Sequence, residues 1–375
     1  MKEKKKENKV KDEKIKFVSA KVVDNIDANV VILLGERTNG KSFAIKELML
    51  KHCYKEKVEF AYIRRYAEDV KDYLIGEYFT DIIANKNGHN YVKEWTNGEY
   101  STIVAYRKSI YFANIDPETE KVTRGQKIGR MFGLSVAEHY KSLSFPNIKY
   151  AFFEEWVTKG SYLPHESKEL LNLISTIFRL RTDGRLFCIG NKVSRVNPYV
   201  GEWGLLPVMK QRGNTIDYYT LRDEDGNETK VACYMTHSNK FGGGIAFGNA
   251  SRAIRGGEWE TDEQPHLHGH RDDYECLYKL VFKYDYMLFL CEFLMDKDGN
   301  FTWFITPKTT PIQPHTRIVA NTYHINKMCT IGFVGVTRQE SVIFEMLRQG
   351  KICFSDNLTG TEFKQCYRQT RGIVL

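Results

Sequence analysis

One eight-residue segment constrains the fold more than any other part of this 375-residue chain. Residues 35–42 read Gly-Glu-Arg-Thr-Asn-Gly-Lys-Ser, which matches the phosphate-binding pattern G-x-x-x-x-G-K-[ST]. An apolar run at residues 30–34 precedes this loop, and a helical pattern of apolar residues starts at Phe43. A strand, a glycine-rich loop and a helix in this order predict an α/β fold. In such a fold a parallel sheet presents the loop and the helix N-terminus to a nucleotide.

The positions of this loop have distinct expected roles in holding phosphate. Backbone N–H groups are expected to receive the phosphates, Lys41 to reach the β- and γ-phosphates, and Ser42 to bind Mg²⁺. The predicted cofactors are therefore ATP and Mg²⁺. The residues expected to contact them are Gly35, Arg37, Thr38, Asn39, Gly40, Lys41 and Ser42, together with Arg64 at the end of the next strand. An ordinary glycine-rich turn between a strand and a helix is the structural alternative.

Composition limits the classes of protein to which the chain can belong. Hydrophobic residues make up 42% of the chain, and its length favours two domains. Eight scattered cysteines without a C-x-x-C pair indicate a reduced, cytosolic protein. We find no signal peptide and no apolar run long enough for a membrane span, and so expect no membrane partner. The net charge of +8 is compatible with an anionic partner.

Changes in composition along the chain predict four segments. Lysines crowd residues 1–20, which we expect to form a basic flexible arm, either solvated or in contact with nucleic acid. Strands alternating with helices over residues 21–225 predict a nucleotide-binding domain with a parallel sheet. The glycine-rich stretch at 226–270 is expected to be a linker. Strand-like runs within 271–375 predict a smaller C-terminal α+β domain.

Two adjacent carboxylates follow a predicted buried strand at residues 148–153. A nucleotide hydrolase needs an acidic group for Mg²⁺ and another group that positions or deprotonates water. Neighbouring side chains at a strand tip point to different sides. We therefore assign Glu154 to the metal, through a water molecule, and Glu155 to catalysis. An ordinary charged strand end is the alternative.

Further polar side chains follow a predicted helix, whose apolar residues run from Leu170 to Phe178, and the predicted strand after it at residues 186–190. Asn191 ends that strand, where a polar residue senses the γ-phosphate in ATPases with an additional strand beside the loop strand; a turn cap is its alternative role. Hydrolysis also benefits from an arginine on the developing negative charge, often donated by a neighbouring subunit. The candidates are Arg64, Arg65, Arg179, Arg181 and Arg185, and for each the alternative is a surface ion pair.

Five strings follow one another along the chain: Gly35–Ser42, Tyr62–Tyr66, Phe153–Glu155, Leu170–Leu173 leading to Phe178-Arg179, and Asn191–Ser194 with Val196–Tyr199. Taken together, they resemble the DNA-encapsidation ATPases of small protein-primed tailed bacteriophages, which are related to large terminases. The Leu-Leu-Asn-Leu and Val-Asn-Pro-Tyr strings are more specific than the phosphate loop. The resemblance covers residues 30 to 200.

The resemblance implies a ring motor, pentameric in that family, that pumps double-stranded DNA into a procapsid. It implies a P-loop ATPase of the additional-strand, catalytic-glutamate type, with Glu155 catalytic and Arg179 reaching into a neighbour's site. The C-terminal domain would be of RNase H type, without nuclease residues, and would dock on the portal or connector. The motor would work in the host cytoplasm, transiently attached to the portal vertex, and whether a structural RNA takes part stays open. The family usually has Asp where this chain has Glu154, which puts direct metal contact in doubt.

Two sets of charged residues leave alternatives open. A two-metal nuclease needs three or four clustered carboxylates, and we expect none here because two of the four C-terminal candidates flank a hairpin turn. These candidates are Asp285, Glu292, Asp296 and Asp298. Contacts with the DNA backbone are expected from a basic cluster that is equally well explained as a solvated face: Lys121, Arg124, Lys127 and Arg130.

Two other functions fit a phosphate-binding loop. A nucleotide-regulated clamp would bind nucleic acid without turnover or translocation. A small-molecule kinase would need an arginine-rich lid over a second substrate pocket, which is not evident, and it would leave the C-terminal domain unexplained.

Overall fold

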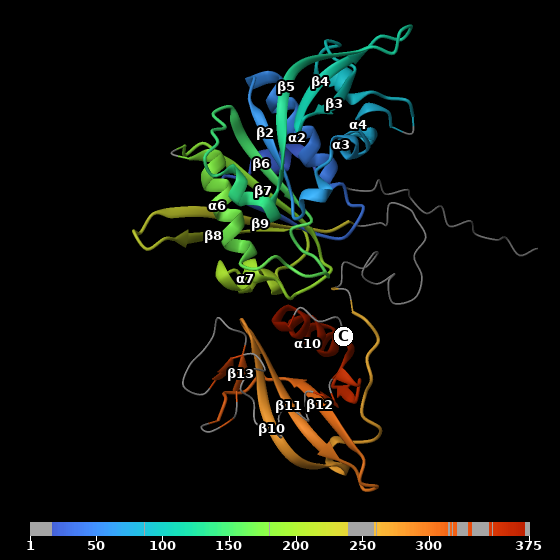
Figure 1. The fold of residues 1–375 in the computed structure, drawn as a ribbon, viewed down its shortest axis with the longest axis vertical. Coiled ribbons are helices and arrows are strands. Elements are labelled where there is room, and N and C mark those ends of the chain that lie inside the picture. Colours follow the sequence, from blue (N-terminus) through green and yellow to red (C-terminus); the bar gives the residue numbers. More distant parts are fainter. Residues whose placement is uncertain are drawn as a thin grey trace, which may run out of the picture.

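The computed structural model describes residues 17–85, 87–179, 181–238, 259, 261–313, 316, 318–320, 329–331, 345–346 and 348–371. Most of the predicted arm at 1–20 and half of the predicted linker at 226–270 lie outside the described residues. The described part of the chain forms two sheets (Figure 1). Helix α10 (Asn357–Arg371) lies on the side of the second sheet that faces the first. None of the described helices is both long and apolar enough to cross a bilayer.

The first sheet has nine described strands in the order β3-β4-β5-β2-β6-β7-β1-β9-β8. The six strands from β5 to β9 run parallel, and β3, β4 and β8 join them antiparallel. This arrangement confirms the predicted α/β class with a parallel sheet. The strands are β1 (Val30–Gly35), β2 (Glu59–Arg64), β3 (Thr102–Tyr106), β4 (Ser109–Ile115), β5 (Val122–Gly133), β6 (Ile148–Glu154), β7 (Arg185–Asn191), β8 (Thr215–Arg222) and β9 (Glu228–Thr236).

Helices cover both faces of the parallel strands, which explains the unbroken apolar run in β1. Ile32 and Leu34 point into one core, whereas Val31 and Leu33 point into the other. The second of these cores is closed by α1 (Ala20–Asp24), α2 (Lys41–Glu56), α3 (Asp72–Tyr78), α4 (Thr80–Ile83) and α5 (Tyr91–Trp95). The first is closed by α6 (Glu166–Phe178), α7 (Pro198–Glu202) and the 3₁₀ turns at Leu134–Tyr140 and Leu206–Lys210.

The position of β9 corrects the predicted start of the linker. Residues 228–236 fall within the segment 226–270, yet they pair in parallel with β1 from Val30↔Val231 to Gly35↔Thr236. The apolar stretch in β9 is short and is followed by glycines, so its own sequence pattern is weak. Its pairing with the buried loop strand makes it a strand, which is a tertiary effect.

The second sheet is mixed, with described strands in the order β14-β13-β10-β11-β12-β15. Strands β10, β11 and β12 are antiparallel neighbours, and β13, β14 and β15 add in parallel. Side chains of α10, including Phe363 and Tyr367, pack against this sheet. The strand bounds are β10 (Glu275–Tyr284), β11 (Met287–Met295), β12 (Phe301–Pro307), β13 (Ile318–Ala320), β14 (Cys329–Ile331) and β15 (Ile352–Phe354).

Candidate nucleotide site

The predicted phosphate loop runs from the last residue of β1 to the second residue of α2. Gly40 takes the left-handed conformation, with φ of +86°, and Thr38 also has a positive φ, of +61°. Only glycine adopts this conformation readily, which explains Gly40 in the pattern. Helix α2 begins at Lys41, so its free N–H groups and the positive end of its dipole lie at the loop.

A cavity of about 810 Å³ opens at this loop. It brings together most of the predicted site residues from three strand ends and the start of α2. The predicted residues that line it are Arg37, Thr38, Asn39, Gly40, Lys41, Ser42, Glu154, Glu155 and Asn191. Phe17 and Val18 also line it, and the Val18 amide donates to the Asn39 carbonyl at 3.0 Å. The end of the predicted arm therefore packs on the loop.

Lys41 is buried at the centre of this arrangement. Its Nζ donates to the Glu36 carbonyl at 2.5 Å, to Asn39 Oδ1 at 3.1 Å and to Asn191 Oδ1 at 3.0 Å. Asn191 reaches it from β7, which lies next to β1 in the sheet. Burial lowers the pKa of Lys41 to about 7, and the charges of Glu154 and Glu36 oppose that shift. A phosphate in the cavity would supply the anion that the buried ammonium lacks.

Glu154 is buried at the tip of β6 and is held by two hydroxyl groups. Ser42 Oγ lies 3.3 Å from its Oε2, and Tyr78 OH donates to its Oε1 at 2.6 Å. Burial raises the pKa of Glu154, and these two hydrogen bonds oppose the shift. Tyr78 comes from α3 and was not predicted as a site residue. No local pattern marks it, because 76 residues separate it from Glu154.

The hydroxyl and carboxylate oxygens of Ser42 and Glu154 are the hard ligands that Mg²⁺ prefers. The described residues contain no cluster of three or more His, Cys, Asp or Glu side chains able to hold a metal. Ser42 and Glu154 supply two oxygens, and Mg²⁺ keeps several waters and takes further oxygens from substrate phosphates. The donor set therefore fits a magnesium nucleotide, with Glu154 and Ser42 as its protein groups.

Glu155 points out of the sheet beside Glu154 and has a positive φ, of +60°. Its side chain is 64% exposed, and Arg64 Nη2 donates to its Oε2 at 2.9 Å. Arg64 also lies 3.6 Å from Asp69. Arg64, which was expected to contact nucleotide, is therefore engaged with carboxylates and is not among the described residues that line the cavity.

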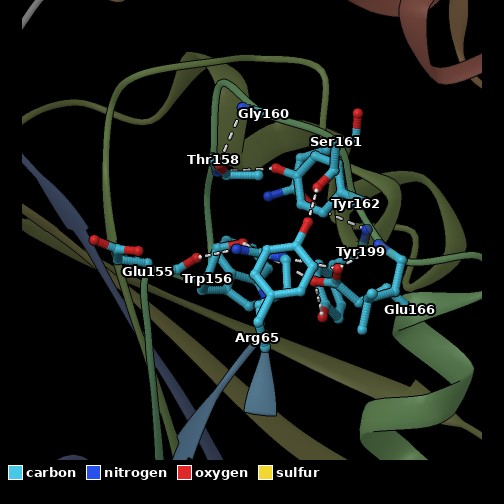
Figure 2. A network of polar contacts seen from close by, with 12 residues as sticks. Arg65, Glu155, Trp156, Thr158, Gly160, Ser161, Tyr162, Glu166 and Tyr199 are labelled. Carbon is cyan, nitrogen blue, oxygen red and sulfur yellow. Dashed lines mark hydrogen bonds and ion pairs between the residues drawn. The ribbon is translucent and has the colours of Figure 1, made fainter. Parts of the chain in front are cut away.

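Arg65, the next residue, anchors the chain that follows Glu155 (Figure 2). Its guanidinium forms a two-point ion pair with buried Glu166, at 2.8 and 2.9 Å. It also donates to the carbonyls of Glu155 and Trp156, at 3.1 and 3.3 Å. Tyr199 OH donates to Glu166 at 2.7 Å and completes the network. Sequence reasoning included Arg65 only as one of several arginines and missed Glu166.

Gly35 contacts β9, Glu36 contacts the two residues that follow β9, and neither is among the described residues that line the cavity. A Cβ on Gly35 would lie 2.1 Å from Thr236 Oγ1, so only glycine fits beside this strand. Asn39 Nδ2 donates to the same Thr236 hydroxyl at 2.6 Å. The Glu36 carboxylate accepts from the Ser238 amide at 2.8 Å and contacts His237 Nδ1. These partners were missed because the segment that carries them was predicted to be a linker.

Arg179 lies between α6 and β7, at the opposite end of β7 from Asn191. Its Nη2 donates to the Leu143 carbonyl at 2.5 Å, and its φ is +48°. It lines a separate cavity with Lys141, Phe145 and Arg181. Within one copy of the chain, Arg179 is therefore not brought together with the other predicted catalytic residues.

The predicted basic cluster is divided among different contacts. Lys127 forms an ion pair with Glu59 at 2.8 Å, and Arg130 lies over the Phe145 ring at 5.4 Å. Arg124 lies over the Tyr106 ring at 4.0 Å. Three of the four predicted basic side chains therefore have partners within the domain.

The chain is similar to DNA packaging proteins of bacteriophages. Residues 119–249 match the family model described as Podovirus DNA encapsidation protein (Gp16). The chain is 25% identical over 338 residues to a DNA packaging protein of Bacillus phage B103, covering 85% of this chain and 97% of that protein.

Two solved structures have a similar fold. One is the bacteriophage Phi-29 viral genome packaging motor assembly, with a TM-score of 0.54 and 18% identity, covering 95% of this chain and all of the other. The second is the Phi-28 gp11 DNA packaging motor, with a TM-score of 0.50 and 18% identity, covering 94% and 98% of the two chains. At this identity the structures show a shared fold. Together with the relatives by sequence, they confirm the predicted resemblance to the DNA-encapsidation proteins of phi29-like bacteriophages.

Proposed function

We propose that this chain is an ATP-driven motor that translocates double-stranded viral DNA into a procapsid. The observation that carries the proposal is the convergence of Lys41, Ser42, Glu154, Glu155 and Asn191 around one cavity. Strand β7 lies between β1 and β6, which supports a P-loop ATPase of the additional-strand type. The relatives, which are DNA packaging proteins, supply the context of genome packaging.

The geometry supports a distinct role for each group in ATP hydrolysis. Lys41 and the start of α2 would bind the phosphates, and Asn191, already bonded to Lys41, would sense the γ-phosphate. When bound, Mg²⁺ would neutralise phosphate charge, with Ser42 and Glu154 holding it directly or through water. Glu155 would orient and deprotonate the attacking water.

The pair formed by Arg64 and Glu155 supports a resting arrangement of the catalytic carboxylate. Arg64 holds Oε2 of Glu155 at 2.9 Å, yet Glu155 also lines the cavity. Rotation of an exposed carboxylate away from Arg64 requires little repacking. We infer that Glu155 must exchange this contact for one with water before hydrolysis.

A ring assembly would account for the position of Arg179. This side chain lies at the end of β7 opposite Asn191, and its Nη2 donates to the Leu143 carbonyl at the surface. Such a residue can complete the site of an adjacent subunit, as an arginine finger does. We therefore propose hydrolysis at subunit interfaces of a homo-oligomeric ring, pentameric by resemblance, at the portal vertex in the host cytoplasm.

The C-terminal sheet is proposed to dock on the portal rather than cut DNA. The antiparallel strands β10, β11 and β12, with β13 and β14 added in parallel beside β10, support the RNase H-type assignment. Glu292 is neutralised by Arg271 and Lys279, and Asp296 accepts from amides of its own turn. These carboxylates are thus engaged within the domain.

The test is steady-state ATP hydrolysis by the full chain with and without double-stranded DNA and empty procapsids, over a range of salt concentrations. We expect turnover that DNA stimulates and that salt suppresses, because DNA contacts release counterions. Lys41→Met should lose both nucleotide binding and turnover. Binding of an ATP analogue without turnover in every condition would contradict the motor and favour the nucleotide-regulated clamp.

A further inference from the structure

Two loops lead away from the proposed catalytic side chains toward the C-terminal domain. Residues 156–165 follow Glu155, and residues 192–197 follow Asn191. Both loops reach α10, which packs on the second sheet with Phe363 and Tyr367. The loop after the proposed catalytic carboxylate and the loop after the proposed sensor amide therefore both contact α10.

Gln365 of α10 bonds to both loops at once. Its Oε1 accepts from Ser194 Oγ at 2.5 Å, and its Nε2 donates to the Lys159 carbonyl at 3.1 Å. Gln365 is only 6% exposed, and Ser194 only 3%. A buried amide whose donor and acceptor serve different segments fixes the distance between those segments, because breaking either bond leaves a polar atom unpaired.

Gln369, one turn further along α10, strengthens the contact with the first loop. Its Nε2 donates to the Gly160 carbonyl at 3.1 Å, and its Oε1 accepts from the Tyr162 amide at 3.3 Å. The side chains of Gln365 and Gln369 on α10 therefore hold the backbone of residues 159–162 by hydrogen bonds.

The other side of this loop is held by the Arg65 network (Figure 2). Arg65 lies 5.0 Å from the Tyr162 ring, and Tyr162 OH accepts from the Thr158 amide at 3.2 Å. Because Arg65 also bonds the Glu155 and Trp156 carbonyls, the loop is tied to the catalytic residue at its start and to α10 further on. Few flexible contacts along this loop can therefore absorb a displacement of either of its ends.

We propose that Gln365 is a positioning residue through which the C-terminal domain sets the relative placement of Glu155 and Asn191. The inference rests on the proposed ATPase function and adds to it a partner for the two catalytic loops. Force or contact applied to the C-terminal domain would then change the rate of hydrolysis through α10. Nucleotide binding, which depends on the phosphate loop, would change little.

The first test compares Gln365→Met with the wild type by steady-state kinetics. Methionine keeps the length and volume of glutamine but lacks both hydrogen bonds. We expect kcat to fall roughly 10- to 100-fold, because small misplacements of catalytic groups have effects of that order. KM and the Kd for an ATP analogue should stay within about twofold of the wild type. An unchanged kcat, or equal changes in kcat and analogue affinity, would overturn the proposal.

Gln211→Met is the matched control. Gln211 Nε2 donates to the Thr215 and Cys233 carbonyls inside the first domain and, among the described residues, has no hydrogen bond with either loop or with α10. Its loss should leave kcat unchanged. Ser194→Ala should reproduce part of the Gln365→Met effect, and the double variant should fall short of the two effects added together, since both act on one contact.

Backbone hydrogen exchange supplies a readout that does not depend on turnover. In Gln365→Met, amides of residues 159–162 and 192–196 should exchange faster than in the wild type and in Gln211→Met. Gln369→Met, at a less buried position, serves if Gln365→Met does not fold. A wild type that binds the analogue but never hydrolyses ATP would contradict the proposed function. In that case hydrogen exchange alone would test the role of Gln365. Unchanged exchange in both loops of the Gln365→Met variant would refute that role.

Discussion

The two sheets of this chain place buried glutamates in opposite surroundings. In the first sheet, Glu154 sits at the carboxyl end of a parallel strand, bonded to two hydroxyls, and burial raises its pKa. In the second sheet, burial also favours a raised pKa for Glu292, yet hydrogen bonds from Arg271 and Lys279 make the net shift a lowering. The second carboxylate has two cationic partners within its domain, whereas the first is bonded to hydroxyl groups and, in the proposed function, would also hold Mg²⁺. The partners of a buried acid, more than its residue type, determine what that acid can do.

The same contrast extends to the neighbouring acids. Glu155 is exposed beside a cavity, and its carboxylate accepts from Arg64. Asp296 accepts from the side-chain amide of Asn300 and from the backbone amides of Asn300 and Asp298 within a hairpin turn, which lowers its pKa. The first arrangement can change during a reaction, whereas the second stabilises local backbone.

The largest effect is expected for Arg179, which lies away from the proposed nucleotide cavity of its own chain. Arg179→Ala should lower DNA-stimulated hydrolysis by about 10³-fold if the arginine acts on a neighbour's phosphate. In mixtures with wild type, activity should fall more steeply than the fraction of variant, since each variant subunit disables an adjacent site. Arg222→Ala, which removes an exposed ion pair with Glu228, is the control. Intact hydrolysis in assembled Arg179→Ala rings would refute this role.

A smaller effect is expected from the hydroxyl that distinguishes Glu154 from Glu292. Tyr78→Phe removes the bond to Glu154 Oε1 and should raise the Mg²⁺ concentration for half-maximal binding of an ATP analogue about tenfold. Tyr150→Phe, which loses a bond to Glu56 outside the cavity, should leave this concentration unchanged. Equal Mg²⁺ dependence in both variants would show that Tyr78 does not support the metal group.

The smallest effect is expected for a third buried acid, Glu362, which lies where α10 contacts the loop after β7. Burial raises the pKa of Glu362 from an ordinary value of 4.5 to about 7, although Arg195, 3.2 Å away, opposes the shift. The folded protein therefore holds this proton more tightly than the unfolded chain. Its contribution to stability is present below about pH 4.5 and is lost as the pH rises to about 7.

Glu362→Gln should flatten this dependence, which amounts to about 1.4 kcal/mol per pH unit for one proton. Urea unfolding at several pH values between 5 and 8 measures it. A slope that is identical in the variant and the wild type would assign the pH dependence to other groups.

The sequence was sufficient to predict the parts of the site whose geometry is local or follows from strand order. The loop, Ser42 and the tips of β6 and β7 meet because carboxyl ends of parallel strands share one edge of a sheet. Tyr78, Thr236 and Gln365 could not be found in this way. They reach the site through packing between segments far apart in the chain, and no periodicity or motif records such contacts.

The measurement that tests the account most directly is single-turnover ATP hydrolysis in the presence of double-stranded DNA, with Glu155→Gln and Glu292→Gln beside the wild type. We predict a loss of about 10²- to 10⁴-fold for Glu155→Gln with analogue binding retained, because a general base is removed. Glu292→Gln should stay within about twofold of the wild type, given the role of Glu292 in an internal ion pair. Wild-type hydrolysis in Glu155→Gln, or equal losses in both variants, would contradict the assignment of catalysis to the first sheet.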